Sequence, residues 1–199
     1  YAETRLAWEP IVEVTQIKGD SETHSKLSPN DDFADFENYE YYIQVGKTEF
    51  MPREADFIRP ALKAGLEIEK SVGVNPYKFG LIGSTDSHSG LSSPEESNFL
   101  GKFATDSTPE TKQRLGGQLS ANGWDMSASG LAAVWAEHNT REEIFAAFKR
   151  REVYATSGPR IILQLYAGWF FPEGAEASND FSNIGSEYGV PMGGELVAT

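Results

Sequence analysis

Three stretches of apolar residues predict β-strands in the first two thirds of the chain. Residues 11–17 (IVEVTQI) alternate apolar with polar side chains and are rich in β-branched residues, as in a strand that emerges from a core. Residues 79–83 (FGLIG) and 131–136 (LAAVWA) are continuously apolar. Such short runs predict strands that are buried on both faces.

The segments that separate these runs have helical patterns. Residues 56–72 carry apolar side chains at helical spacing, with Asp56 as the expected N-cap. Thr140-x-x-Glu143 is a capping box and predicts a helix directly after it, with a cationic last turn. A similar box at residues 93–96 predicts a short helix, and the acidic, aromatic residues 33–42 form either a short helix or a lid.

The order of strand and helix signals predicts the fold class, which is α/β. Alternation of strand and helix implies parallel β/α units, arranged in an open sheet or in a barrel. After Pro159 the pattern changes, because residues 160–166 resemble a strand and the rest is rich in Gly, Ser and Asn. We therefore expect a β/α portion over residues 1–159 and a β-rich appendage over residues 160–199. Both ends look cut, so we expect an excerpt of a longer protein.

Composition restricts the partners. Thirty acidic and seventeen basic residues give a net charge of -13, which opposes binding to nucleic acid and to anionic membrane surfaces. No apolar run is long enough to span a bilayer, so we expect no membrane insertion. The absence of cysteine excludes disulfides and thiolate metal sites, and it is compatible with an exported or periplasmic protein. A small anionic substrate stays possible, because a bound cation reverses the field inside one pocket.

The candidate chemistry lies with the histidines. All three lie beside an acidic residue, in the patterns Glu22-x-His24, Asp86-x-His88 and Glu137-His138. In parallel β/α proteins the working residues lie at the carboxyl ends of strands, and each pattern follows a predicted strand.

Asp86 and His88 are the strongest candidates, because they follow the buried strand at residues 79–83. A turn at that point can present a carboxylate oxygen and an imidazole nitrogen together, which suits zinc, manganese or iron. The alternative is that Asp86 caps a turn and that His88 is a surface residue.

The other candidates are less specific. Glu22 and His24 are either a ligand or supporting pair, or part of a solvated acidic loop. Glu13 faces the site or the core, depending on the strand register. Adjacent strand residues point to opposite faces, so at most one residue of Glu137-His138 faces a site.

Arg160 follows Gly158-Pro159 and could bring a guanidinium to an anionic group. The alternative is that this segment is only a turn that joins a helix to a strand.

The motif at residues 79–88 (FGLIGSTDSH) resembles the last metal-binding motif of PHP (polymerase and histidinol phosphatase) domains, an Asp-x-His after a barrel strand. More closely, the chain resembles the bacterial domain of unknown function 3604 family. The matching stretches are residues 13–24, 66–88, 130–139 and 151–161.

This resemblance implies the C-terminal part of a PHP-like distorted (β/α)7 barrel, followed by the start of a small β appendage. It also implies a site of two or three divalent ions (Zn, Mn or Fe) in the complete protein, with Asp86 and His88 among the ligands. Such a metal lowers the pKa of its water to about 7 and so makes a nucleophile at neutral pH.

The chain departs from the PHP pattern in having only three histidines and no His-x-His. We therefore expect that these residues alone form neither a complete metal site nor an active enzyme. Exposed strand edges of a partial barrel also favour pairing with a second copy.

Three functions stay open. The first is a fragment of a metal-dependent phosphoester hydrolase, in which Asp86 and His88 bind metal, Glu22 and His24 assist, and Arg160 contacts the substrate. The second is a non-catalytic acidic module that binds calcium or protein. The third is a hydrolase of a C–N bond or a sulfate ester.

Overall fold

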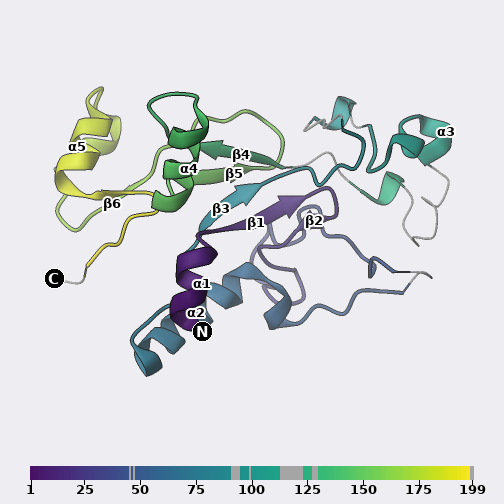
Figure 1. Ribbon diagram of the computed structural model, residues 1–199, viewed down its shortest axis with the longest axis horizontal. Coiled ribbons are helices and arrows are strands. Elements are labelled where there is room, and N and C mark those ends of the chain that lie inside the picture. Colours follow the sequence, from purple (N-terminus) through teal and green to yellow (C-terminus); the bar gives the residue numbers. More distant parts are fainter. Residues whose placement is uncertain are drawn as a thin grey trace.

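The computed structural model describes residues 1–44, 46, 48–90, 95–98, 100–112, 123–126 and 130–197. It is a mixed α/β structure in which the helices surround small sheets of two or three strands (Figure 1). No closed barrel is formed by the residues within these ranges. The α/β class predicted from the sequence is therefore confirmed, and the barrel stays a prediction.

The central sheet has the order β2-β1-β3. Strands β1 (Ile11–Gln16) and β3 (Gly80–Gly83) are parallel, and helix α2 (Ile58–Val72) lies between them in sequence, as the alternation predicted. The register shifts by one residue between Glu13 and Thr15, which marks a β-bulge near the carboxyl end of β1. Strand β2 (Gly19–Asp20) then turns back antiparallel to β1.

The second sheet corrects the prediction that every β/α unit is parallel. Strands β4 (Leu131–Val134) and β5 (Val153–Thr156) pair antiparallel, although helix α4 (Arg141–Arg150) separates them. The amide of Trp135 donates to the carbonyl oxygen of Glu152 over 2.9 Å. The antiparallel hydrogen bonding between β4 and β5 therefore continues to the residues that flank the segment containing α4. Helix α4 therefore lies in the loop that connects the two strands of a β-hairpin.

Strand β5 runs in the same direction as β3. Gly80 packs against Val153 at the start of β5, whereas Gly83 packs against Leu131, the partner of Thr156 at its end. Strands β1, β3 and β5 therefore end at one edge, and β4 begins there (Figure 1).

The helix starts differ in how well the sequence predicted them. Helix α2 begins after Phe57, and Asp56 instead accepts from the backbone N–H of Arg53 in a short 3-10 turn, so the predicted Asp56 cap was wrong. Thr140 caps α4 as predicted, because its hydroxyl oxygen accepts from the amide of Glu143 over 3.3 Å.

Replacing Thr140 by alanine is expected to lower the free energy of unfolding by about 1 kcal/mol, because the amide of Glu143 loses its partner. Chemical denaturation of the two proteins measures this difference. Thr140→Ser is the matched control and keeps the wild-type stability, because serine retains the accepting oxygen. Equal losses in both variants would contradict the capping role.

The C-terminal segment is not purely β. Strands β6 (Tyr166–Ala167) and β7 (Val190–Pro191) form a short antiparallel pair that contacts helix α5 (Phe181–Tyr188). The sequence analysis missed α5, and the strand predicted over residues 160–166 is limited to its last residue. The Trp135 indole donates to Leu163 over 2.8 Å, which ties the segment to β4.

Other elements lie at the periphery. Helix α1 (Ala2–Trp8) was not predicted from the sequence, and its Arg5 lies 5.0 Å from the centroid of the Tyr77 ring. Helix α3 (Pro109–Lys112) is a single turn. Residues 33–37 form turns and Tyr41 forms a β-bridge with Glu49, so residues 33–42 contain no helix. The start of the short helix predicted at residues 93–96 lies outside the described residues. The 3-10 turns are Glu54–Asp56, Glu96–Asn98, Ala104–Asp106, Gly123–Asp125 and Ala175–Ala177.

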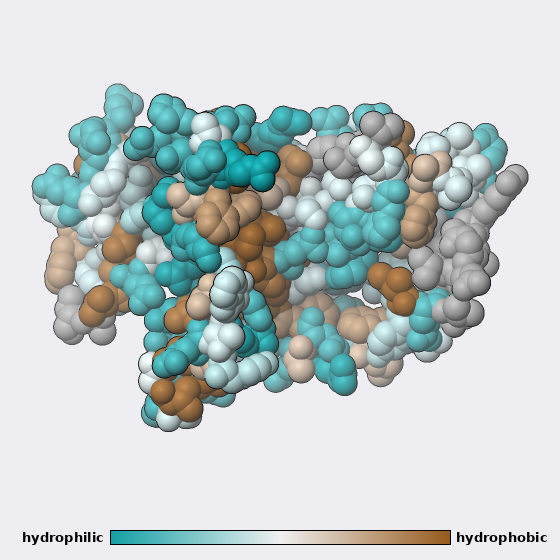
Figure 2. Space-filling view, in the orientation of Figure 1, coloured by the Kyte–Doolittle hydropathy of each residue, from teal (hydrophilic) through white to brown (hydrophobic). Residues whose placement is uncertain are grey.

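The hydrophobic core is small and lies around the central sheet. Its buried side chains include Val14 and Ile17 of the β1 region, Ile58 of α2 and Val153 of β5. The accessible surface is 12845 Å², whereas a compact protein of this mass exposes about 9300 Å². Large apolar side chains are among the exposed residues, for example Trp8, Phe33 and Ile162, and Figure 2 shows brown patches on one face. Over the described ranges, no helix has the length and apolar character that crossing a bilayer requires.

Candidate metal site at the end of strand β3

The turn that follows β3 is fixed by backbone hydrogen bonds to β1. The amide of Ser84 donates to Thr15 over 3.0 Å, and the carbonyl oxygen of Thr85 accepts from Ile17 over 3.3 Å. Asp86 then adopts a left-handed conformation with φ of 49°, which aspartate tolerates better than most residues. The sharp turn directs the next residues away from the sheet axis.

Asp86 and His88 lie together at this turn. A carboxylate oxygen of Asp86 is 3.9 Å from Nδ1 of His88, and the two side chains are 39% and 50% exposed. Nδ1 also lies 2.8 Å from the carbonyl oxygen of Asp86. A carbonyl oxygen only accepts, so Nδ1 carries the proton and Nε2 has the lone pair. This is the usual support of a histidine that binds metal through Nε2.

Lys102 contacts the same carboxylate. Its Nζ lies 2.7 Å from Oδ2 of Asp86 and 3.2 Å from the carbonyl oxygen of that residue, and the lysine side chain is only 8% exposed. The amide of His88 donates to the carbonyl oxygen of Lys102 over 2.6 Å, which fixes the two segments together. Sequence reasoning missed Lys102, because nothing in its local pattern marks a contact sixteen residues away.

Further charged side chains lie beside this pair. Glu13 of β1 accepts from the hydroxyl of Ser84 and, over 2.8 Å, from the side-chain amide of Gln16, so it faces the end of β3. Burial lowers the pKa of Lys18, and the nearby carboxylates of Glu13, Asp20 and Asp86 oppose that shift. Carboxylates and ammonium groups therefore lie near one another at this edge of the sheet.

Asp20 and Glu22 have different environments. Asp20 accepts from the amides of Glu22 (2.8 Å) and Thr23 (3.2 Å), while burial raises the pKa of its carboxyl group. The Glu22 carboxylate instead pairs with Arg59 at 2.5 Å, and Arg59 also pairs with Asp31 at 2.8 Å. Glu22 is thus engaged by an arginine, and its proposed assisting role stays a prediction.

His24 lies in an aromatic environment beside this loop. Its Nδ1 accepts from the amide of Lys26 over 3.1 Å, and its ring lies 6.5 Å from Phe50 and 6.1 Å from Phe57. Burial lowers the pKa of His24, and the charge of Lys26 acts in the same direction. Neutral imidazole is therefore the favoured form at His24.

We expect the contribution of His24 to stability to fall as the pH is lowered from 6.5 through its folded pKa. A folded pKa below the ordinary value means that the unfolded chain binds more protons in this window, so stability rises with pH there. Denaturation of the wild type and of His24→Gln over this range measures the difference. The exposed His138→Gln variant is the control, and a gap between wild type and His24→Gln that widens toward acid would contradict the prediction.

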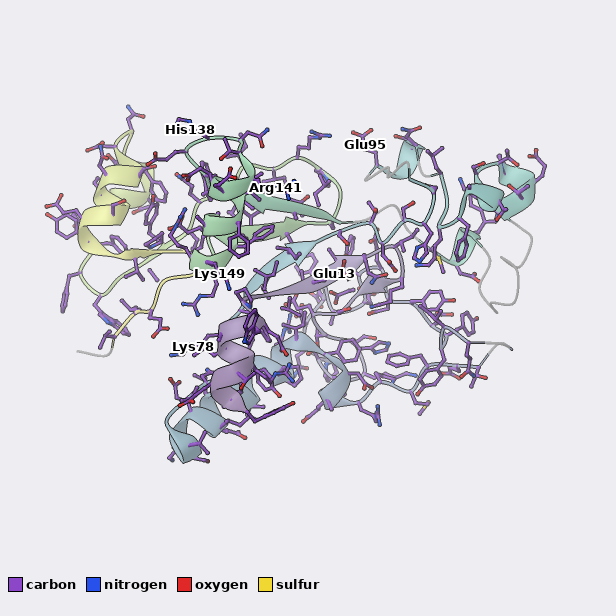
Figure 3. The ribbon with its side chains drawn as sticks, in the orientation of Figure 1. Glu13, Lys78, Glu95, His138, Arg141 and Lys149 are labelled. Atoms are coloured by element: carbon purple, nitrogen blue, oxygen red, sulfur yellow. The ribbon has the colours of Figure 1, made fainter. Side chains whose placement is uncertain are left out.

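The remaining candidates lie elsewhere. Glu137 and His138 are exposed and follow β4, which ends at the edge opposite to the ends of β1 and β3. Figure 3 accordingly shows His138 far from Glu13. The expectation that all three histidines follow strands at one edge was therefore wrong, because β4 is antiparallel. Arg160 is exposed on the segment after β5, whose end lies at the same edge as that of β3.

Within the described part of the chain, no group of three or more histidine and acidic residues is arranged to hold a metal ion. Asp86 and His88 supply one oxygen and one nitrogen donor, which is the donor set that zinc, manganese and iron accept. These two residues fit a divalent ion chemically, and a stable site requires further ligands.

Fold and site together define a mixed α/β protein whose parallel strands end in a cluster of acidic, histidine and lysine side chains. The whole chain, residues 1–199, matches the family described as "Protein of unknown function (DUF3604)", and it belongs to that family. The resemblance to this family seen in the sequence is thereby confirmed, and the resemblance to PHP domains stays a prediction. No curated protein and no solved structure matches the chain.

Proposed function

We propose that this chain is part of a PHP-like metal-dependent hydrolase in which Asp86 and His88 bind a divalent ion. The observation that carries the proposal is that one turn at the end of a parallel strand holds both residues, with the Asp86 carboxylate 3.9 Å from Nδ1 of His88. The protonated Nδ1 supports binding through Nε2, as argued above.

The side chains around the pair have separable tasks in this proposal. Asp86 and His88 hold the ion, and Lys102 pairs with the Asp86 carboxylate and competes with the ion for it. Glu13 holds the turn through Ser84. A bound divalent ion would supply an activated water at neutral pH and polarise the bond to be cleaved.

A small anionic substrate fits this edge of the sheet better than a neutral one. Carboxylates offset the ammonium groups of Lys18 and Lys102, so a bound ion would supply the positive charge that attracts the substrate. Arg160 is exposed on the segment that follows β5, and it is proposed to contact the substrate. We propose a phosphoester as the bond cleaved.

The β/α frame supports the comparison with PHP barrels. Strands β1 and β3 form a parallel pair around α2, and β5 has the same direction. We propose that these strands belong to a distorted (β/α)7 barrel in the full-length protein. The large exposed apolar surface fits contacts with further barrel strands, and exposed strand edges also allow pairing of two copies.

The test is hydrolysis by the full-length protein, with Zn, Mn or Fe, of aryl phosphate mono- and diesters, an aryl sulfate and an anilide. We expect phosphoester hydrolysis that needs the metal and falls at least about a hundredfold in Asp86→Asn. Glu137→Gln is the matched control, because Glu137 is exposed at the opposite edge. Hydrolysis of the sulfate or the anilide instead would reassign the bond. Calcium binding without any hydrolysis would favour the non-catalytic acidic module.

A further inference from the structure

An open pocket of about 310 Å³ lies beside the loop that carries Asp20 and His24. Five of its twelve lining residues are tyrosine or phenylalanine, namely Tyr39, Tyr41, Tyr42, Phe50 and Phe57. Tyr42 and Phe50 pack at 5.2 Å with an interplanar angle of 80°, and Tyr39 and Tyr41 pack at 6.1 Å and 82°. The paired rings stand nearly perpendicular, so each pair joins the edge of one ring to the face of the other.

Acidic side chains surround these rings. Asp20 and Asp56 line the pocket, and an adjoining hollow that shares His24, Tyr41 and Phe50 adds Asp35, Glu40 and Glu49. Asp56 pairs with Arg53 at 2.9 Å and Glu49 with Lys26 at 3.3 Å. Among the described residues, neither Asp35 nor Glu40 has an ion-pair partner, so this rim carries excess negative charge.

We propose that this pocket binds an organic cation of the alkylammonium class. Ring faces attract a cation through their quadrupole, and a rim of carboxylates adds Coulomb attraction. An anion would be repelled by the same rim, and a neutral apolar group would gain nothing from it. The proposal concerns a separate ligand and does not require the metal site at Asp86.

Lys18 also lines the pocket, and its charge bears on the proposal. Its ammonium donates to the hydroxyl of Ser21 over 2.9 Å and lies near the carboxylates of Glu13, Asp20 and Asp86. Asp86 is already paired with Lys102, so the carboxylates of Glu13 and Asp20 are the groups that offset the charge of Lys18.

The test compares choline with its uncharged isostere 3,3-dimethylbutan-1-ol by calorimetric or NMR titration of the metal-free 199-residue chain at constant ionic strength. We expect saturable binding of choline that is at least about tenfold tighter than binding of the isostere. Tyr42→Leu is expected to weaken choline binding about tenfold, and Glu40→Gln about threefold.

Tyr188→Leu is the matched control, because Tyr188 is a comparably exposed tyrosine on α5, outside the pocket. It is expected to leave the affinity for choline unchanged. Glu40 is exposed, so Glu40→Gln tests the acidic rim without risk to folding. Equal binding of choline and its isostere, or an unchanged affinity in Tyr42→Leu, would overturn the proposal. So would binding of a neutral sugar in preference to choline.

Discussion

Replacing Gly130 by alanine is expected to lower the free energy of unfolding by about 3 kcal/mol or more. Gly130 has φ of 108°, which L-residues rarely adopt, and a Cβ atom there would collide with the backbone carbonyl group of Ser84. The backbone conformation costs about 1–2 kcal/mol for an L-residue, and forcing atoms into a packed site costs about 1–3 kcal/mol more. The collision lies directly before Asp86, so the turn that carries the candidate ligands is displaced as well.

Gly73→Ala is the matched control for this experiment. Gly73 also has a positive φ, 80°, but a Cβ atom there meets nothing within 4 Å. Its loss of stability is therefore expected to be about 1 kcal/mol, from the left-handed conformation alone. Chemical denaturation of both variants gives the comparison. Equal losses would show that β4 and the turn after β3 do not pack as closely as described.

Replacing Lys102 by methionine is expected to tighten the binding of Mn²⁺ at least about tenfold. The ammonium of Lys102 lies 2.7 Å from Asp86 and competes with the ion for the same carboxylate. Two unit charges at 4 Å interact by about 4 kcal/mol near a protein surface, and the partial exposure of Asp86 reduces this. If about 1.4 kcal/mol of this interaction energy remains, its loss already corresponds to about a tenfold change in the affinity for Mn²⁺.

Lys112→Met is the control for this substitution. Lys112 is also a buried lysine, but its ammonium lies 5.0 Å from the Trp124 ring centroid rather than beside Asp86. Calorimetric titration with Mn²⁺ is expected to give the wild-type affinity for this variant. An unchanged or weaker affinity in Lys102→Met would mean that the ion does not use the Asp86 carboxylate.

The sequence predicted the features that local patterns determine. Strand β3 and helix α4 have short-range signals, a continuous apolar run and a capping box, and both were found where expected. Asp86 and His88 are two residues apart, so one turn suffices to bring them together. The parallel pairing of β1 with β3 also followed from the helix between them.

Features that depend on tertiary contacts were not predictable in this way. Helix α4 suggested a parallel crossover, yet the pairing of Trp135 with Glu152 makes it an excursion from an antiparallel hairpin. Because β4 is antiparallel to β5, His138 follows the opposite edge of the sheet from Asp86 and His88. Lys102 contacts Asp86 from a segment sixteen residues away, and the residues around Lys102 in the sequence do not predict this ion pair.

The most direct test of the central claim is the paramagnetic broadening of the three histidine ring signals by substoichiometric Mn²⁺, followed by NMR. Broadening falls steeply with distance, so the three rings report separately on the position of the ion. The account predicts that the His88 signals broaden first, that those of His138 stay sharp, and that Asp86→Asn removes the effect. Broadening centred on His138 or His24, or the same broadening at His88 in Asp86→Asn, would contradict it.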